Sequence, residues 1–93
     1  GQGGWDTLSP SAIAFGGNLP KTPRAMTVED IAATQQAFVA AAQRSLAAGF
    51  EWLELHFAHG YLAHEFYSPL ANQRTDAYGG SFENRSRFLL ETF

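Results

Sequence analysis

The sequence predicts an α/β fold, and the order of its hydrophobic segments is the reason. An amphipathic helix is expected over residues 28–48, and an alternating apolar strand follows at Phe50–His56 after a single glycine, Gly49. So short a passage from helix to strand is half of an α/β repeat, in which helices cover a parallel strand. A loop dense in His, Tyr, Asn, Arg and Asp then leaves the carboxyl end of the strand, where α/β enzymes place their chemistry.

A single strand cannot complete a sheet, because both of its edges would lack hydrogen-bond partners. The sequence predicts one such strand and two long helices within the 93 residues. Residues 1–93 are therefore expected to be part of a domain and not a complete one. The predicted fold class is a fragment of a (β/α)8 TIM barrel, about one third of a domain of ~250 residues. An independent domain with an unusual fold is the alternative.

The first half of the chain is expected to be a loop followed by the long helix. Residues 1–26 contain five glycines and three prolines, which interrupt regular structure. The apolar patch Ala12–Phe15 within them is either an edge strand or a plug under the loop. Thr27 is a favourable N-cap for the helix, and Asp30 gives a weak capping box. Gly49 is the expected C-terminal stop.

The second half is expected to be a connection that leads into another helix. A short helix is predicted across Leu62–Phe66, and the Gly79–Gly80 pair predicts a turn. Ser81 is the expected N-cap of the second long helix, with Glu83 favourably placed in its first turn.

Composition excludes several classes of protein. The net charge is only −3 and no basic run is present, which argues against nucleic acid and anionic membranes as partners. The chain has no cysteine, so disulfides and thiolate metal sites are excluded. No apolar run approaches the ~18 residues that span a bilayer. The first ten residues lack the pattern of a signal peptide, so a cytoplasmic protein is expected.

Three histidines lie within nine positions at the end of the predicted strand. His56 ends the strand and His59 follows in a turn that Gly60 can tighten. Two imidazoles so placed can donate N–H groups to one ligand oxygen, as in an oxyanion clamp. The alternative is a pair of structural histidines. Tyr61 is either an aromatic that packs the loop or a phenol that donates a proton to a carbanion.

Metal binding is a competing interpretation of the same loop. His56, His59, His64 and Glu65 are all residue types that bind zinc. The chain lacks H-E-x-x-H, however, so the expected metal content is none.

Polar residues elsewhere are expected to have structural roles. Arg74, Asp76, Asn84 and Arg85 are predicted to form a brace of ion pairs and hydrogen bonds that orders the loop. Glu54 points inward from the predicted strand and is expected to be a buried polar partner of the site.

Several motifs occur together and in order. They are H-x-x-H-G-Y from His56, N-x-R-x-D-x-Y-G-G-S from Asn72 and E-N-R-x-R-F from Glu83. With S-P-S-A-I upstream, they resemble the Old Yellow Enzyme family of flavin-dependent ene-reductases, and most closely its bacterial branch that includes xenobiotic reductases. The resemblance covers nearly the whole chain.

The resemblance implies a (β/α)8 barrel that binds FMN and uses NAD(P)H as co-substrate. The chain would supply the loop after strand three, helix three, strand four with its loop, and the start of helix four. The family's substrate-clamping pair falls on His56 and His59, and its proton donor falls on Tyr61. Cofactor-binding residues within this chain stay unknown, because most of the family's flavin contacts lie outside it.

The implied reaction passes hydride from NAD(P)H through flavin to activated alkenes, such as enones and nitro compounds. The expected partners are a small-molecule substrate and the remainder of the barrel, and a homo-oligomer is left open. Two rival functions also stay open: a metal-dependent barrel enzyme with histidine ligands, and a non-catalytic or oligomerisation module. The sequence does not choose between NADPH and NADH.

Overall fold

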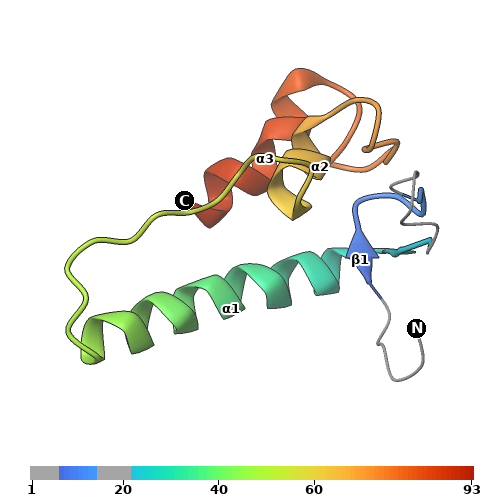
Figure 1. Ribbon diagram of the computed structural model, residues 1–93. Helices are drawn as coiled ribbons and strands as arrows, with labels where there is room; N and C mark the ends of the chain where they lie inside the picture. Colours follow the sequence, from blue (N-terminus) through green and yellow to red (C-terminus); the bar gives the residue numbers. More distant parts are fainter. Residues whose placement is uncertain (1–6, 15–21) are drawn as a thin grey trace.

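The computed structural model describes residues 7–14 and 22–93, and within them it contains two short strands and three helices (Figure 1). The strands are β1 (Leu8–Ser9) and β2 (Arg24–Ala25), and the helices are α1 (Val28–Ala47), α2 (Leu62–Tyr67) and α3 (Phe82–Thr92). All three helices were predicted from sequence, and their bounds agree to within one residue where both bounds were predicted. No helix in the described ranges is long and apolar enough to cross a membrane.

Helix α1 has the ends that its sequence predicted. Thr27 Oγ1 accepts a hydrogen bond from the Asp30 amide at 3.0 Å, and the Asp30 carboxylate accepts one from the Thr27 amide at 2.9 Å. These two bonds form the expected capping box, and the bond from Thr27 is the main reason why the pKa of Asp30 is lowered. At the other end Gly49 has φ 99°, and the Phe50 amide donates to the Ser45 carbonyl at 3.1 Å. This is a Schellman cap.

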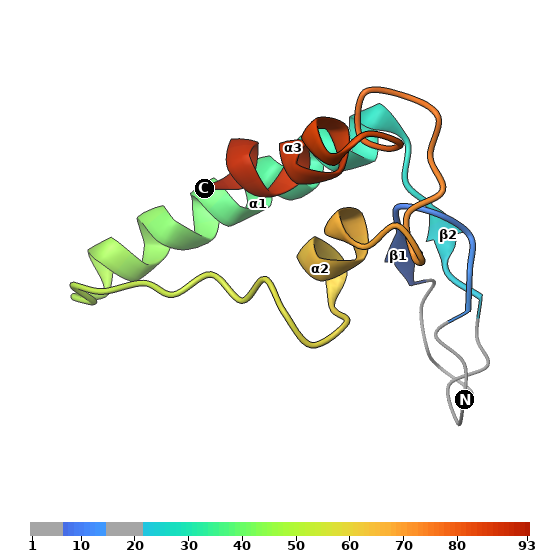
Figure 2. The same cartoon turned by 90° about the horizontal axis from the view of Figure 1, so that it is seen from above.

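The strand predicted at Phe50–His56 is not formed. Residues 50–58 run as an irregular extended segment between α1 and α2, with no strand beside it in the described part of the chain (Figure 2). A β-strand is held by hydrogen bonds to an adjacent strand. A segment with an alternating apolar sequence therefore remains irregular when no strand lies beside it. Trp52 is 86% exposed as a result, and Phe50 is 63% exposed.

The loop predicted for residues 1–26 contains a small parallel ladder instead. Leu8 lies opposite Arg24 and Ser9 opposite Ala25. The Arg24 amide donates to the Thr7 carbonyl, and the Met26 amide donates to the Ser9 carbonyl, each at 2.8 Å. The patch Ala12–Phe15 forms no strand at Ala12, Ile13 or Ala14. Phe15, together with residues 1–6 and 16–21, lies outside the described residues.

The hydrophobic core lies where α2 and α3 meet the first turn of α1. Its buried members are Met26, Ile31, Ala63, Phe66 and Phe88. The rings of Phe66 and Phe88 stack in parallel, with centroids 4.3 Å apart and an interplanar angle of 10°. Helix α3 lies along the first half of α1 only, and the second half of α1 extends beyond it (Figures 1 and 2).

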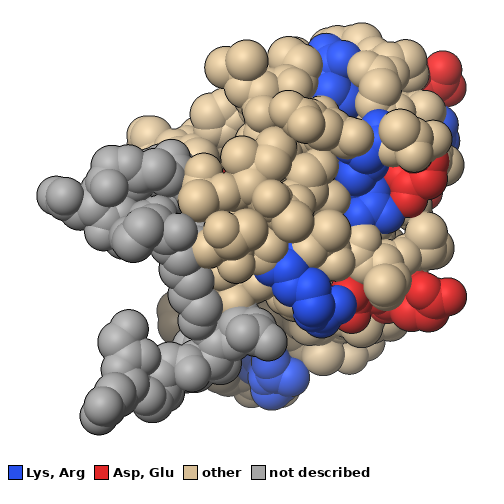
Figure 3. Space-filling model, turned by 90° about the vertical axis from the view of Figure 1, so that its right-hand side faces the viewer, with Lys and Arg blue, Asp and Glu red and all other residues tan. Residues whose placement is uncertain are grey.

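Charged side chains lie beside one another on the face shown in Figure 3. The ion pairs are Arg24–Asp30 at 2.9 Å and Arg74–Asp76. Arg24 and Arg74 are thus each paired with a nearby carboxylate.

Candidate functional site

Three side chains that the sequence singled out come together at the end of the extended segment. The ring centroids of His56 and His59 are 5.1 Å apart with an interplanar angle of 39°, and those of His56 and Tyr61 are 5.5 Å apart at 60°. All three residues are exposed, and Tyr61 is 66% exposed. We call these residues the His–Tyr cluster. Imidazole and phenol groups in this arrangement present several hydrogen-bond donors to one small ligand.

A tight turn brings the second histidine back toward the first. His59 has φ 62° and Gly60 has φ 77°, so two consecutive residues are left-handed. The Tyr61 amide donates to the Ala58 carbonyl at 3.4 Å, which closes a turn of type I′. The left-handed conformation costs a residue other than glycine about 1–2 kcal/mol. Gly60 therefore tightens the turn as predicted, while His59 bears the strain.

Helix α2 begins immediately after this turn, with Tyr61 as its N-cap. Tyr61 makes no side-chain capping bond, which is unusual because Ser, Thr, Asp or Asn normally fills this position. The ring of His64 instead accepts a hydrogen bond at Nδ1 from the Gly60 amide, at 2.8 Å. The phenol of Tyr61 is thus left out of the helix cap and remains beside His56.

The four proposed metal ligands do not converge. His64 faces the Gly60 amide, and Glu65 accepts a 3.4 Å hydrogen bond from the Ser9 hydroxyl. Burial raises the pKa of Glu65 above its usual value. Across residues 7–14 and 22–93, no three His, Cys, Asp or Glu side chains are grouped closely enough to hold a metal ion.

Glu54 is exposed, so its predicted role as a buried polar partner is wrong. That prediction assumed a strand with one face turned into a barrel lumen. Residues 50–58 form no ladder here, and so Glu54 has no enclosed side to face.

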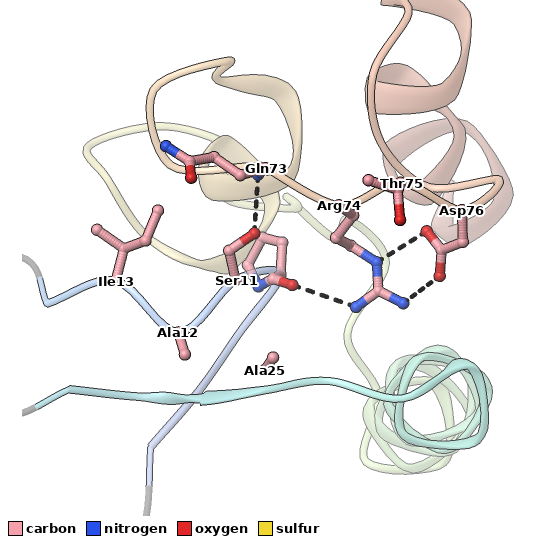
Figure 4. Close-up of a pocket in the computed structure, with 9 residues that line it drawn as sticks. Ser11, Ala12, Ile13, Ala25, Gln73, Arg74, Thr75 and Asp76 are labelled. Carbon is pink, nitrogen blue, oxygen red and sulfur yellow. Dashed lines mark hydrogen bonds and ion pairs between the residues drawn. The ribbon is translucent and has the colours of Figure 1, made fainter.

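The predicted brace is present, and Arg74 is its centre (Figure 4). Its guanidinium pairs with both carboxylate oxygens of Asp76, and it also donates to the carbonyls of Pro10, at 3.2 Å, and Met26. The Arg74 side chain is only 10% exposed. One side chain thus joins the loop before β2, the start of α1 and its own turn, beside a cavity of about 410 Å³.

The other two brace residues join α3 to the turn before it. The Asn84 amide group donates to the Gly79 carbonyl at 3.0 Å. Arg85 donates to the Tyr67 carbonyl at 3.0 Å and to the Gly80 carbonyl at 2.6 Å. The brace therefore fixes α2 and α3 relative to each other.

Asn72 is a central residue that the sequence reasoning missed. It is buried, and its side-chain amide donates to the carbonyls of Phe66, at 2.7 Å, and Tyr78, at 2.8 Å. Its side-chain oxygen accepts the Arg74 amide at 3.0 Å. A buried polar side chain with all its bonds made specifies one loop conformation. The only sequence signal was its place at the head of the N-x-R-x-D-x-Y-G-G-S motif.

Gly79→Ala is expected to destabilise the protein. A Cβ at this position would lie 2.5 Å from the Arg74 carbonyl oxygen and 2.6 Å from the Arg74 Cβ, so the backbone must move. The expected loss in the free energy of unfolding is about 1–3 kcal/mol, measured by urea denaturation of the complete polypeptide. Gly80→Asn is the comparison variant: its φ of 90° strains a side chain, but no atom lies within 4 Å of the added Cβ, so its loss measures backbone strain without a steric clash. Equal stability of Gly79→Ala and the parent would contradict the close approach.

The Arg74–Asp76 pair predicts acid sensitivity. Hydrogen bonds from Arg74 are the main cause of the lowered pKa of Asp76. A pKa lowered by folding means that the carboxylate stabilises the fold at neutral pH, and that this stabilisation is lost as pH falls below about 4. Asp76→Asn should therefore cost stability at pH 7 and little at the acid end. The free energy of unfolding is measured in urea at several pH values. If the ion pair contributed nothing, the difference between the parent and Asp76→Asn would be the same at every pH.

The sequence pattern of the NADH:flavin oxidoreductase / NADH oxidase family matches residues 6–93. The chain belongs to this family.

Individual relatives agree with this assignment. The NADPH dehydrogenase of Bacillus velezensis is 60% identical over 87 residues, which are 94% of this chain and 25% of that protein. The structure of morphinone reductase in complex with tetrahydroNAD matches with a TM-score of 0.91 and 35% identity, over 95% of this chain and 28% of that one. For Old Yellow Enzyme from Pichia sp. AKU4542 the TM-score is 0.84 and the identity 44%, over 91% of this chain and 24% of that one.

The resemblance to the Old Yellow Enzyme family is thereby confirmed, and so is the barrel fold. The closer resemblance to the xenobiotic-reductase branch stays a prediction. The chain spans about a quarter of the length of the curated relatives that it matches.

Proposed function

We propose that this chain supplies the substrate-binding loop of an FMN-dependent ene-reductase that takes reducing equivalents from NAD(P)H. The substrates are alkenes activated by a carbonyl or nitro group. The observation that carries the proposal is the convergence of the His–Tyr cluster, with ring centroids 5.1 and 5.5 Å apart. Family membership provides the cofactor, and the cluster provides the donors that such a substrate needs.

The residues present fit the substrate side of such a site better than a phosphate site. Three arginines, Arg74, Arg85 and Arg87, donate to backbone carbonyl groups of this chain. The groups that hold the phosphate of FMN are therefore expected outside this chain. The cluster is suited to a neutral polar ligand, because its imidazole and phenol donors match a carbonyl or nitro oxygen.

FMN, when bound, would supply the hydride that the alkene takes up at its β-carbon. Negative charge then develops on the activating oxygen, and His56 and His59 are assigned the role of donating N–H hydrogen bonds to it. Each donor of this kind is commonly worth ~10²–10³ in rate. Tyr61 is assigned the role of protonating the α-carbon, which commonly contributes ~10²–10⁴.

Two local features favour a functional role for the cluster over a structural one. His59 occupies a left-handed conformation, and Tyr61 occupies an N-cap position without capping the helix. Neither a left-handed histidine nor a tyrosine at the N-cap position favours local stability, and both residues are exposed. Residues that break local rules without a packing gain are expected at functional sites.

An absorption spectrum of the purified complete polypeptide, followed by an assay with NAD(P)H and an enone, tests the function. The spectrum should show an absorption band of the flavin at about 450 nm, which is a property of the cofactor itself. In the assay, NAD(P)H should be consumed only when the enone is present. A protein that binds metal and lacks the flavin band would instead support the metal-dependent alternative.

Residues 1–93 are proposed to be part of a barrel domain and not a complete one. The extended segment has no neighbouring strand in the described ranges, and Trp52 and Phe50 are largely exposed. Expressed alone, the chain should be poorly folded or self-associated, because these surfaces lack partners. Thermal melting and sedimentation of the isolated chain check this. A sharp, cooperative melt of a monomer would refute it.

A further inference from the structure

The ring of His64 makes a contact that the proposed chemistry does not use. Its Nδ1 accepts a hydrogen bond from the Gly60 amide at 2.8 Å, and the ring is half-buried. That amide belongs to the peptide group that joins His59 to Gly60, at the centre of the left-handed turn. His64 is the third residue of α2, which begins at Leu62 directly after the N-cap Tyr61.

This contact resembles half of a capping box displaced by one residue. In a capping box, the side chain of the third helical residue accepts the N-cap amide. Here the side chain accepts the amide of the residue before the N-cap, Gly60. This hydrogen bond orients the peptide group between His59 and Gly60. The directions of the His59 and Tyr61 side chains both depend on how that peptide group is oriented.

We propose that His64 is a positioning residue, whose ring holds the peptide between His59 and Gly60 and so keeps the His–Tyr cluster assembled. The proposal rests on the proposed function of the cluster. The turn needs such support because a left-handed His59 is disfavoured by about 1–2 kcal/mol. The next side chain, Glu65, cannot provide it, since its carboxylate faces the hydroxyl of Ser9 at 3.4 Å.

The hydrogen bond also defines the state of the ring. An Nδ1 atom that accepts a proton donor carries no hydrogen, so the neutral ring is protonated at Nε2. The acceptor at Nδ1 is what the turn requires, and a side chain with an oxygen at the same distance from Cα should replace it. Asn places its amide oxygen there, Leu places a methyl group there, and Gln places its oxygen one bond farther away.

The test compares His64→Asn, His64→Leu and His64→Gln in the complete flavin-loaded protein. Two quantities are measured: the dissociation constant for 4-chlorophenol, whose oxygen mimics the charged substrate oxygen that the cluster is proposed to bind, and the hydrogen-exchange rate of the Gly60 amide. His64→Leu should weaken phenol binding by about tenfold, the factor expected for one hydrogen bond, and should speed exchange at Gly60. His64→Gln should behave like His64→Leu, and His64→Asn should remain close to the parent.

Parent-like binding and exchange in His64→Leu would overturn the proposal, as would equal losses in His64→Asn and His64→Leu. If His64→Leu does not fold, His64→Gln and His64→Asn carry the same comparison. His56→Ala serves as the reference for the proposed function. If His56→Ala leaves phenol binding unchanged, the function of the cluster is wrong. If His56→Ala weakens binding while His64→Leu and His64→Gln do not, only the role of His64 is wrong.

Discussion

Removal of both imidazoles, in His56→Ala/His59→Ala, is expected to abolish tight binding of phenols and to slow reduction of enones more than either single substitution. Each single variant should lose ~10²–10³ in the rate of alkene reduction. The rings are 5.1 Å apart and are proposed to donate to one oxygen, so the two losses should be coupled and not simply additive.

The binding measurement uses a phenol as a mimic of the charged oxygen. Hydrogen bonds from both rings favour the phenolate, because bonds to a charged acceptor are the stronger ones. A phenolate stacked on oxidised flavin should give a long-wavelength charge-transfer band. The variants should lose this band at phenol concentrations that saturate the parent, while flavin stays bound.

Persistence of the band and of the affinity in both single variants and in the double variant would make the histidines structural. Loss of flavin from the variants would instead indicate a cofactor site, and loss of a metal would favour the metal-dependent alternative.

Tyr61→Phe is expected to slow the oxidative half-reaction, in which the alkene is reduced, by ~10²–10⁴. Reduction of flavin by NAD(P)H should stay nearly unchanged, because only the alkene step requires a proton on carbon. Stopped-flow measurement of each half-reaction separates the two.

Tyr67→Phe is a suitable control for this substitution. Tyr67 lies at the end of the same short helix, where its ring packs edge-on against Phe82 with centroids 5.7 Å apart. It should leave both half-reactions unchanged. Equal slowing of both half-reactions by Tyr61→Phe would assign Tyr61 a structural role.

The sequence predicted those elements whose determinants are local. Thr27 and Asp30 cap α1, Gly49 ends it and Ser81 caps α3, and each acts within a few residues of its own position. The brace around Arg74 was also predictable, because oppositely charged and amide side chains are concentrated in one polar loop.

Determinants that are distant in sequence were not predictable in the same way. The strand at Phe50–His56 required a neighbour that the described residues do not provide, and the two-residue strands β1 and β2 are too short to carry a hydrophobic period. Within the site, the spacing of His56 and His59 predicted their convergence. The bond from Gly60 to His64 was not predicted, since histidine is not among the residues whose side chains usually accept backbone amides at a helix N-terminus.

The reach of Arg74 along the chain has a consequence for how this region opens. Its guanidinium bonds to carbonyl groups 64 and 48 positions earlier, and both bonds depend on the same side-chain conformation. Closing each of these long loops costs conformational entropy on folding, and a side chain already held by one bond needs less ordering to make the other, so losing one anchor weakens the other. The ladder of β1 and β2, the start of α1 and the turn around Asp76 should therefore unfold as one cooperative unit. Amide protons in these three separate stretches are expected to exchange with solvent through a single shared opening event.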